Sequence, residues 1–221
     1  MAIHFYWSSG SPYCSRVALA LEHKALSYES HQLNLDLWEH QSPQMLSLNF
    51  RGQVPVLRDD DYVVFESLAI LYYLDRKYPE PPIFGRTAEE GGVIMRVICE
   101  YQAYVEEHLM KIVRAVFDGQ AQEHIDALAD SMHVVAREAR SIEARLSRSE
   151  WVVGEHFSAA DIVIFPALQL LLRALDKPAA RALSSRFLPL AVNYPALERW
   201  IGRVAALPGY ERTYPPHWRS T

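Results

Sequence analysis

The stretch Ile3 to Glu22 constrains the fold more than any other part of the chain. Ile3 to Trp7 is a run of β-branched and aromatic residues, which predicts a short buried strand. The Ala- and Leu-rich segment Arg16 to Glu22 predicts a helix. Between them Ser11 precedes Pro12, and serine is a preferred N-cap while proline is favoured at the first helical position. The chain should therefore pass from a buried strand into a helix that begins at Ser11.

The N-terminus of this helix is a place where an anion is stabilised, because free N–H groups and the positive end of the helix dipole meet there. The sequence Ser11-Pro12-Tyr13-Cys14 has a hydroxyl where the redox motif of glutaredoxins has its first thiol. A hydroxyl is a poor redox group but a good hydrogen-bond donor to a thiolate supplied by another molecule. Two interpretations of Ser11 follow, a plain helix cap or a donor to a bound thiolate. Cys14 is expected to be a small buried residue of the helix.

Composition excludes several classes of protein. The chain has 221 residues, enough for one large domain or two small ones. A net charge of −5 without any basic run argues against a nucleic-acid surface. No apolar stretch approaches the roughly 20 residues of a membrane span, and we expect no signal peptide. Cys14 and Cys99 are too few for a disulfide framework, which indicates a cytoplasmic protein, and the nine histidines show no metal-ligand spacing, so no metal is expected.

The rest of the first half alternates between strands and helices. The expected elements are a strand at 26–35, a short irregular helix at 37–48, a strand at 54–57, a hairpin strand at 62–65 and a helix at 68–77. A helix separates the first two strands, so they should pair in parallel. Pro55 confines its strand to an edge of the sheet or to a special turn. The order is that of a thioredoxin-like domain.

The second half contains no convincing strand. Helices are expected at 91–117, 121–146, 162–175, 181–188 and 194–206, with an irregular tail to residue 221. The predicted fold class is an α/β thioredoxin-like N-terminal domain at 1–79, a linker at 80–86 and an all-α C-terminal domain at 87–221.

With these elements in place, the whole chain resembles a cytosolic glutathione S-transferase. Four motifs carry the resemblance in order: Ser11 to Cys14, Gln53 to Leu57, Glu66-Ser67, and Gly154 with Ser158 to Asp161. The Val-Pro pair followed by Glu-Ser is the most specific part. The resemblance implies a detoxifying enzyme that activates glutathione as a thiolate and adds it to a small hydrophobic electrophile. It also implies a cytoplasmic homodimer without a metal.

The resemblance further implies how glutathione is bound. The Pro55 bond in this family is cis, and the bend turns the N–H and C=O of Val54 toward the cysteinyl backbone of glutathione. Ser67, at a helix N-terminus, takes the carboxylate of the γ-glutamyl group, and Glu66 or Gln53 takes its ammonium. The family often has a basic residue where this chain has Gln53.

Ser11 is then the residue that donates a hydrogen bond to the thiolate. The pair Ser8-Ser9 is also similar to the zeta class, whose members isomerise maleylacetoacetate, and in that alignment Ser9 would be the equivalent residue. The placement of Arg16 on the family's first helix favours Ser11, as in the tau, omega and related Ser or Cys classes. The alternatives are a glutathione-dependent isomerase or reductase and a non-catalytic glutathione-binding module.

An electrophile pocket is predicted from aromatic residues. Tyr101, Tyr104 and His108 recur at helical spacing on one face, and with Tyr13 they form the candidate pocket; the equal alternative is that they are core or interface residues.

Two further positions are predicted to be structural. Ser158 and Asp161 form a capping box, which in this family is important for folding. Arg51 stands where some classes have an aromatic dimer contact, so a more polar dimer interface is expected.

Overall fold

The computed structural model describes residues 2–185 and 187–219, and these fall into two units. The first unit comprises the chain up to Ile83 together with the segment from Leu207 onward, and the second runs from Phe84 to Ala206. The boundary lies within the expected linker at 80–86. The tail differs from the expectation, because it groups with the N-terminal unit and not with the helical one.

A mixed sheet is the centre of the first unit. Its strands are β1 (Ile3–Trp7), β2 (Tyr28–Gln32), β3 (Val56–Asp59) and β4 (Tyr62–Phe65), in the order β2-β1-β3-β4. β1 and β2 are parallel, as predicted, while β3 pairs antiparallel with both β1 and β4. The thioredoxin-like arrangement is therefore confirmed.

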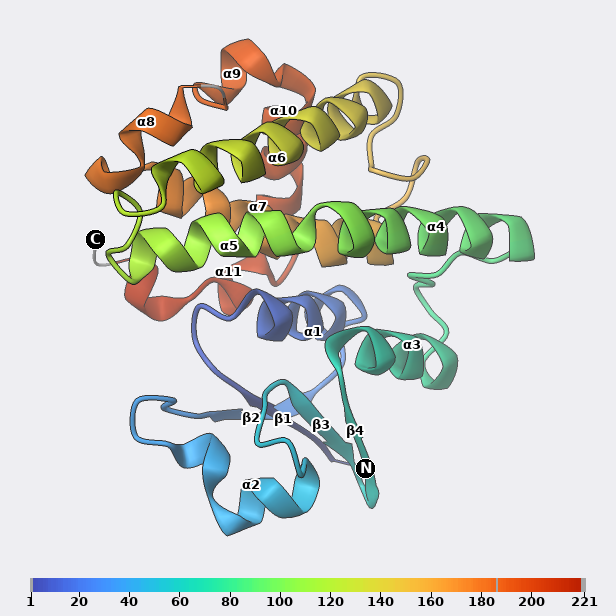
Figure 1. Ribbon diagram of the computed structural model, residues 1–221. Coiled ribbons are helices and arrows are strands. Elements are labelled where there is room, and N and C mark those ends of the chain that lie inside the picture. The colour runs from blue at the N-terminus through green and yellow to red at the C-terminus, as the bar shows by residue number, and fades with distance from the viewer. Residues whose placement is uncertain (1, 186, 220–221) are drawn as a thin grey trace. The chain divides into compact units, whose positions relative to one another are not determined.

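Helices cover both faces of this sheet (Figure 1). On one face, α1 (Pro12–His23) packs beside α3 (Ser67–Lys77). On the other face, α2 (Pro43–Leu48) follows the 3-10 turn Glu39–Gln41, and its Met45 lies in a cluster with Tyr6 and Val56.

Pro55 occupies a special turn before β3. Of the two alternatives predicted for it, an edge strand or a special turn, the structure has the turn, since β3 lies between β1 and β4. The Val54–Pro55 bond is cis, and the strand begins only at Val56. Because the proline precedes the first paired residue, it removes no hydrogen bond from the ladder.

The C-terminal tail is more regular than expected. It contains α11 (Tyr210–Thr213) and the 3-10 turn Pro216–Trp218, and α11 contacts α1. Arg212 Nε donates to Glu22 Oε2 at 2.8 Å, and Tyr28 donates to the other oxygen of Glu22 at 2.9 Å. This ion pair fastens the tail to the C-terminal turn of α1.

The second unit is helical in the residues described. Its elements are α4 (Ala88–Tyr104), α5 (Glu106–Phe117), α6 (Ile125–Leu146), α7 (Ala159–Leu175), the 3-10 turn Pro178–Ala180, α8 (Arg181–Ser184), α9 (Leu190–Asn193) and α10 (Pro195–Ala205). The apolar α7 is buried along most of its length and packs against α4 and α5. None of the described helices is long and apolar enough to cross a membrane.

Two helix predictions in this unit need correction. The single helix expected at 91–117 is interrupted at Val105, whose φ of −122° and ψ of −48° end α4 and begin α5. The helix expected at 181–188 is shorter, and residue 186 lies outside the described residues.

Candidate active site

Ser11 is the N-cap of α1, as predicted. Its φ of −73° and ψ of 120° are extended, and its Oγ accepts a hydrogen bond from the Cys14 N–H at 3.3 Å. Pro12 is the first helical residue. The hydroxyl also interacts with the Cys14 thiol. A neutral sulfur is a weak acceptor, so the hydroxyl hydrogen is available to any stronger acceptor placed at this helix end.

The thiol of Cys14 is buried and protonated. Burial raises its pKa to about 11, an effect larger than that of its hydrogen bonds with Ser11 and the Ser8 backbone. The expectation of a shielded thiol is confirmed. Because a thiolate is the reactive form, Cys14 is poorly placed to act as a nucleophile.

Ser9 is engaged by the tail. Its Oγ is 2.8 Å from His217 Nδ1, within hydrogen-bond distance. The adjacent Gly10 has a φ of +83°, and a Cβ there would lie 3.1 Å from the His217 ring. Sequence reasoning missed His217, because nothing in the sequence signals a contact between residues 208 positions apart.

The loop that leads to Pro55 is held by Asn49. This buried side chain donates to the Gln53 carbonyl at 2.9 Å and accepts from the Arg51 N–H at 3.1 Å. Val54 then follows at the cis bond, half-buried, while Gln53 is exposed. Asn49 was not predicted, although a buried asparagine beside Gly52 is a recognisable turn signal.

The N-terminus of α3 has no side-chain cap. Its N-cap, Glu66, has a φ of +70° and no side-chain capping hydrogen bond, and Ser67 is the buried first residue. A non-glycine residue at positive φ costs of order 1–3 kcal/mol, and such strain concentrates at functional sites. The Ser67 hydroxyl accepts from Arg16 Nη1 at 3.4 Å.

Arg16 is the most important residue that sequence reasoning missed at this site. Its side chain is only 1 % exposed, and its guanidinium lies 4.8 Å from the centre of the Tyr13 ring. A buried guanidinium beside the Ser67 hydroxyl adds positive charge to the uncapped N–H groups of α3. An arginine within an Ala- and Leu-rich buried helix could have signalled this role.

The predicted pocket residues of the second unit lie in different environments. Tyr101 is 3 % exposed and lines an apolar cavity with Val105 and Leu109, whereas Tyr104 is 60 % exposed. His108 is half-buried, with Nδ1 3.4 Å from the Ser131 hydroxyl. The interruption at Val105 separates His108 from the helix that carries both tyrosines. Tyr13 belongs to the first unit and is half-buried.

The capping box at α7 is confirmed. The fully buried carboxylate of Asp161 accepts hydrogen bonds from the Ser158 N–H and hydroxyl, both at 3.0 Å. It also accepts from the Val152 N–H at 2.9 Å and from Trp200 Nε1 at 2.8 Å. Asp161 therefore joins the loop before α7 to α10, which is a structural function.

Comparison with known proteins identifies the family. The model of the glutathione S-transferase N-terminal domain matches residues 5–82, and that of the C-terminal domain matches residues 105–208. Maleylacetoacetate isomerase of Pseudomonas aeruginosa is 28 % identical, over 100 % of this chain and 99 % of its own. Glutathione S-transferase F10 of Arabidopsis thaliana is 30 % identical, over 73 % of this chain and 78 % of its own.

Solved structures agree with this assignment. A glutathione S-transferase from the Antarctic clam Laternula elliptica superposes with a TM-score of 0.84, at 28 % identity, covering 100 % of this chain and 95 % of its own. The chain belongs to the glutathione S-transferase family. It is an enzyme of that class, and glutathione is its substrate.

Proposed function

We propose that Ser11 activates the glutathione thiol as a thiolate, which then adds to a small hydrophobic electrophile. The observation that carries this proposal is the place of the Ser11 hydroxyl at the N-cap of α1, where a weak sulfur acceptor, the Cys14 thiol, is its partner among the described residues. Ser9 is the weaker candidate for this role because its hydroxyl is already bonded to His217.

The energy required is within reach of this arrangement. A free thiol has a pKa near 8.5 and is only slightly ionised at neutral pH. Lowering the pKa by about two units takes roughly 2.7 kcal/mol. A hydrogen bond to a charged group contributes about 1.5–3 kcal/mol, and a helix N-terminus adds about 0.3–1 kcal/mol. The mechanism therefore needs no general base.

The N-terminus of α3 supplies the second anchor. Ser67 and the uncapped N–H groups would bind the γ-glutamyl carboxylate, with Arg16 close behind. Glu66 or Gln53, both exposed, would bind the ammonium group. The N–H and C=O of Val54, at the turn before Pro55, would pair with the cysteinyl backbone.

The electrophile would lie against α4 and α5 of the second unit. Tyr104 and His108 of the second unit have exposed atoms and are suitable to contact an apolar substrate. Tyr101 is buried and would act by shaping the helix beneath the pocket.

Titration of thiolate absorbance tests the activation step directly. Glutathione bound to the protein should ionise well below pH 8.5, and S-methylglutathione, which has no thiol, provides the blank. A panel of halide, epoxide, enone and peroxide substrates then identifies the electrophile. A bound thiol with the pKa of free glutathione would refute the proposed mechanism.

A second candidate function is glutathione-dependent cis–trans isomerisation. It is favoured by the similarity to the Pseudomonas aeruginosa isomerase along the full length of both chains. An isomerase regenerates glutathione in every turnover, whereas a conjugating enzyme consumes it. Measuring free thiol while a cis-dienoic substrate is converted separates the two reactions.

We also propose that the enzyme is a cytoplasmic homodimer. Phe50 is 70 % exposed in the single chain, and the Arg51 guanidinium lies 4.9 Å from the centre of its ring. A second copy could cover this aromatic and cationic pair. Light scattering of the purified enzyme, compared with that of Phe50→Ala, would test the assembly, and a wild-type monomer would refute it.

A further inference from the structure

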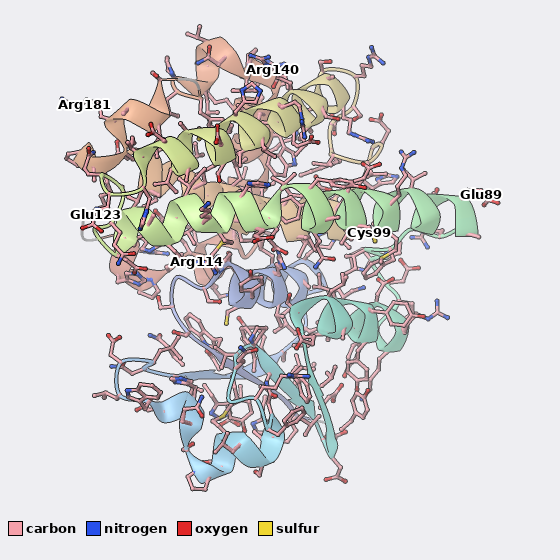
Figure 2. All side chains as sticks on the ribbon, in the orientation of Figure 1. Glu89, Cys99, Arg114, Glu123, Arg140 and Arg181 are labelled. Atoms are coloured by element: carbon pink, nitrogen blue, oxygen red, sulfur yellow. The ribbon has the colours of Figure 1, made fainter. Side chains whose placement is uncertain are left out.

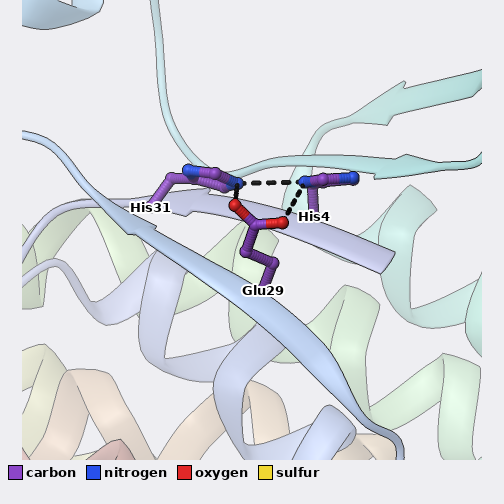
Figure 3. A group of neighbouring side chains, drawn as sticks. All are labelled: His4, Glu29 and His31. Atoms are coloured by element: carbon purple, nitrogen blue, oxygen red, sulfur yellow. Dashed lines mark hydrogen bonds and ion pairs between the residues drawn. The ribbon is translucent and has the colours of Figure 1, made fainter. Parts of the chain in front are cut away.

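A cluster of two histidines and one glutamate lies on β1 and β2, and it has no part in the proposed glutathione site. Figure 3 shows His4, Glu29 and His31 converging from the two neighbouring strands. His4 is paired with Glu29 in the parallel ladder, and His31 follows Glu29 by two positions. Since side chains alternate along a strand, all three project from the same face of the sheet.

The distances within the cluster match those between ligands of one metal ion. His4 Nδ1 lies 3.0 Å from His31 Nε2. One oxygen of Glu29 is 3.3 Å from the His4 nitrogen, and the other is 3.3 Å from the His31 nitrogen. Ligands about 2.1 Å from a shared ion, at angles between tetrahedral and octahedral, lie roughly 2.9–3.4 Å apart. An ion could therefore enter with little movement of the side chains.

The rings are held in place before any ion binds. The imidazoles of His4 and His31 stack with centroids 5.3 Å apart, and the Tyr6 ring stacks on His31 at 4.5 Å. The two histidine side chains are only 17 % and 29 % exposed, whereas Glu29 is 61 % exposed. Solvent therefore reaches the cluster from the side of Glu29, and water can complete the coordination of an ion.

The charge around the cluster also bears on its ligand. Arg58 of β3 is paired with His4, so one cation lies on the same face of the sheet. The Glu29 carboxylate offsets that charge. Two imidazoles and one carboxylate suit borderline ions of the zinc, nickel and copper group better than calcium or magnesium.

We propose that His4, Glu29 and His31 bind one divalent transition-metal ion of the zinc type. Such an ion would join the edge strand β2 to β1 and stabilise the first unit. The spacing of the histidines gave no sign of this site, because strand pairing brings the ligands together across 27 residues.

Calorimetric titration with Zn²⁺ tests the proposal. The chain should be free of affinity tags, treated with chelator and kept free of glutathione, whose thiol binds metals. The exposed Cys99 of α4 (Figure 2) is changed to serine (Cys99→Ser) in every sample, so that its thiol cannot bind Zn²⁺. We expect one ion per chain at pH 7.5, a rise in melting temperature with Zn²⁺, and loss of binding at pH 5.5 as protons compete.

Variants assign the binding to the cluster. We expect Zn²⁺ binding to weaken at least about tenfold in each of the variants His4→Ala, His31→Ala and Glu29→Gln. Loss of an outer-shell partner already costs about tenfold or more in metal affinity, and these residues would be direct ligands. The exposed His133 of α6 provides the matched control, since His133→Ala should leave binding unchanged. Conjugation by these variants should stay at the wild-type rate, so failure here is distinct from failure of the Ser11 mechanism.

Two results would overturn the proposal. One is the absence of saturable Zn²⁺ binding, which would leave only a hydrogen-bonded cluster. The other is binding that survives in both histidine variants. If those variants do not fold, the imidazole NMR signals of the wild-type protein test whether Zn²⁺ binds at the cluster. Zn²⁺ should shift the signals of His4 and His31, and shifts restricted to other histidines would refute the site.

Discussion

The oxygen of Ser11 is expected to have two separable roles, and substitutions can divide them. As an acceptor it caps α1 by bonding the Cys14 N–H, and as a donor it would stabilise the glutathione thiolate. Ser11→Ala removes both roles. Ser11→Asp keeps a good capping acceptor but has no hydrogen to donate, and it adds a negative charge. Ser11→Thr retains both roles.

The two effects differ in size and in the quantity measured. Loss of the cap should lower the free energy of unfolding by about 0.5–2 kcal/mol in Ser11→Ala, and by much less in Ser11→Asp. Loss of a hydrogen bond to a charged group, worth about 1.5–3 kcal/mol, should raise the pKa of the bound thiol by roughly 1–2 units. In Ser11→Asp the rise should be at least as large, because the carboxylate repels the thiolate.

Denaturant unfolding measures the first effect, and thiolate absorbance of bound glutathione measures the second. Ser9→Ala is the matched control, and it should leave the thiol pKa unchanged because the Ser9 hydroxyl is bonded to His217. A Ser11→Ala enzyme with lower stability and an unchanged thiol pKa would show that Ser11 is only a cap. A rise in pKa in Ser9→Ala would transfer the role of donor to Ser9.

Three further outcomes follow from the contacts described. Ser67→Ala should weaken glutathione binding by roughly 1–3 kcal/mol in calorimetry, and unchanged affinity would contradict the carboxylate site. Asp161→Ala should destabilise the fold by more than the roughly 0.5–2 kcal/mol of a simple cap, because buried donors lose their acceptor. Burial raises the pKa of Cys14 from 9.0 to about 11, so its contribution to stability should be constant below pH 9 and fall between about pH 9 and 11. The fall in stability over this range should be smaller in Cys14→Ala, and an equal fall would assign the pH dependence to other groups.

Local signals predicted most of the first unit correctly. The strand Ile3–Trp7, the cap at Ser11 and the helix after Glu66 depend on neighbouring residues, and each lies where the sequence placed it. Pro55 was harder to place. The rule that proline is excluded from interior strands is sound. The strand begins two residues later than expected, at Val56, so the proline lies outside it and the strand itself is interior.

The errors share a physical cause, which is dependence on distant contacts. The break at Val105 has no glycine or proline to announce it, and an apolar β-branched residue is common within helices. The tail seemed irregular because its short helix is stabilised by contacts with α1, almost 200 residues away in sequence. Arg16 was visible as a residue, but its bond to Ser67 depends on the packing of α1 beside α3.

The contacts of the tail and of Arg16 both involve α1, and α1 lies at both ends of the proposed glutathione site. Ser11 at its N-terminus would hold the thiolate, and Arg16 reaches Ser67 at the end of α3 that would hold the γ-glutamyl carboxylate. A displacement of α1 would therefore disturb both anchors together.

The rest of the first unit restrains α1 at both of its ends. Just beyond its C-terminus, Lys24 forms a buried 2.9 Å ion pair with Asp75 of α3, and Arg212 of the tail binds Glu22. At its other end, His217 of the tail holds Ser9 in the loop that leads to Ser11. The tail thus contacts α1 near its C-terminus and the loop before its N-terminus. Through the ion pair of Arg212 with Glu22, a segment that shows no catalytic motif in the sequence therefore helps to hold the helix whose N-cap, Ser11, would activate the thiol.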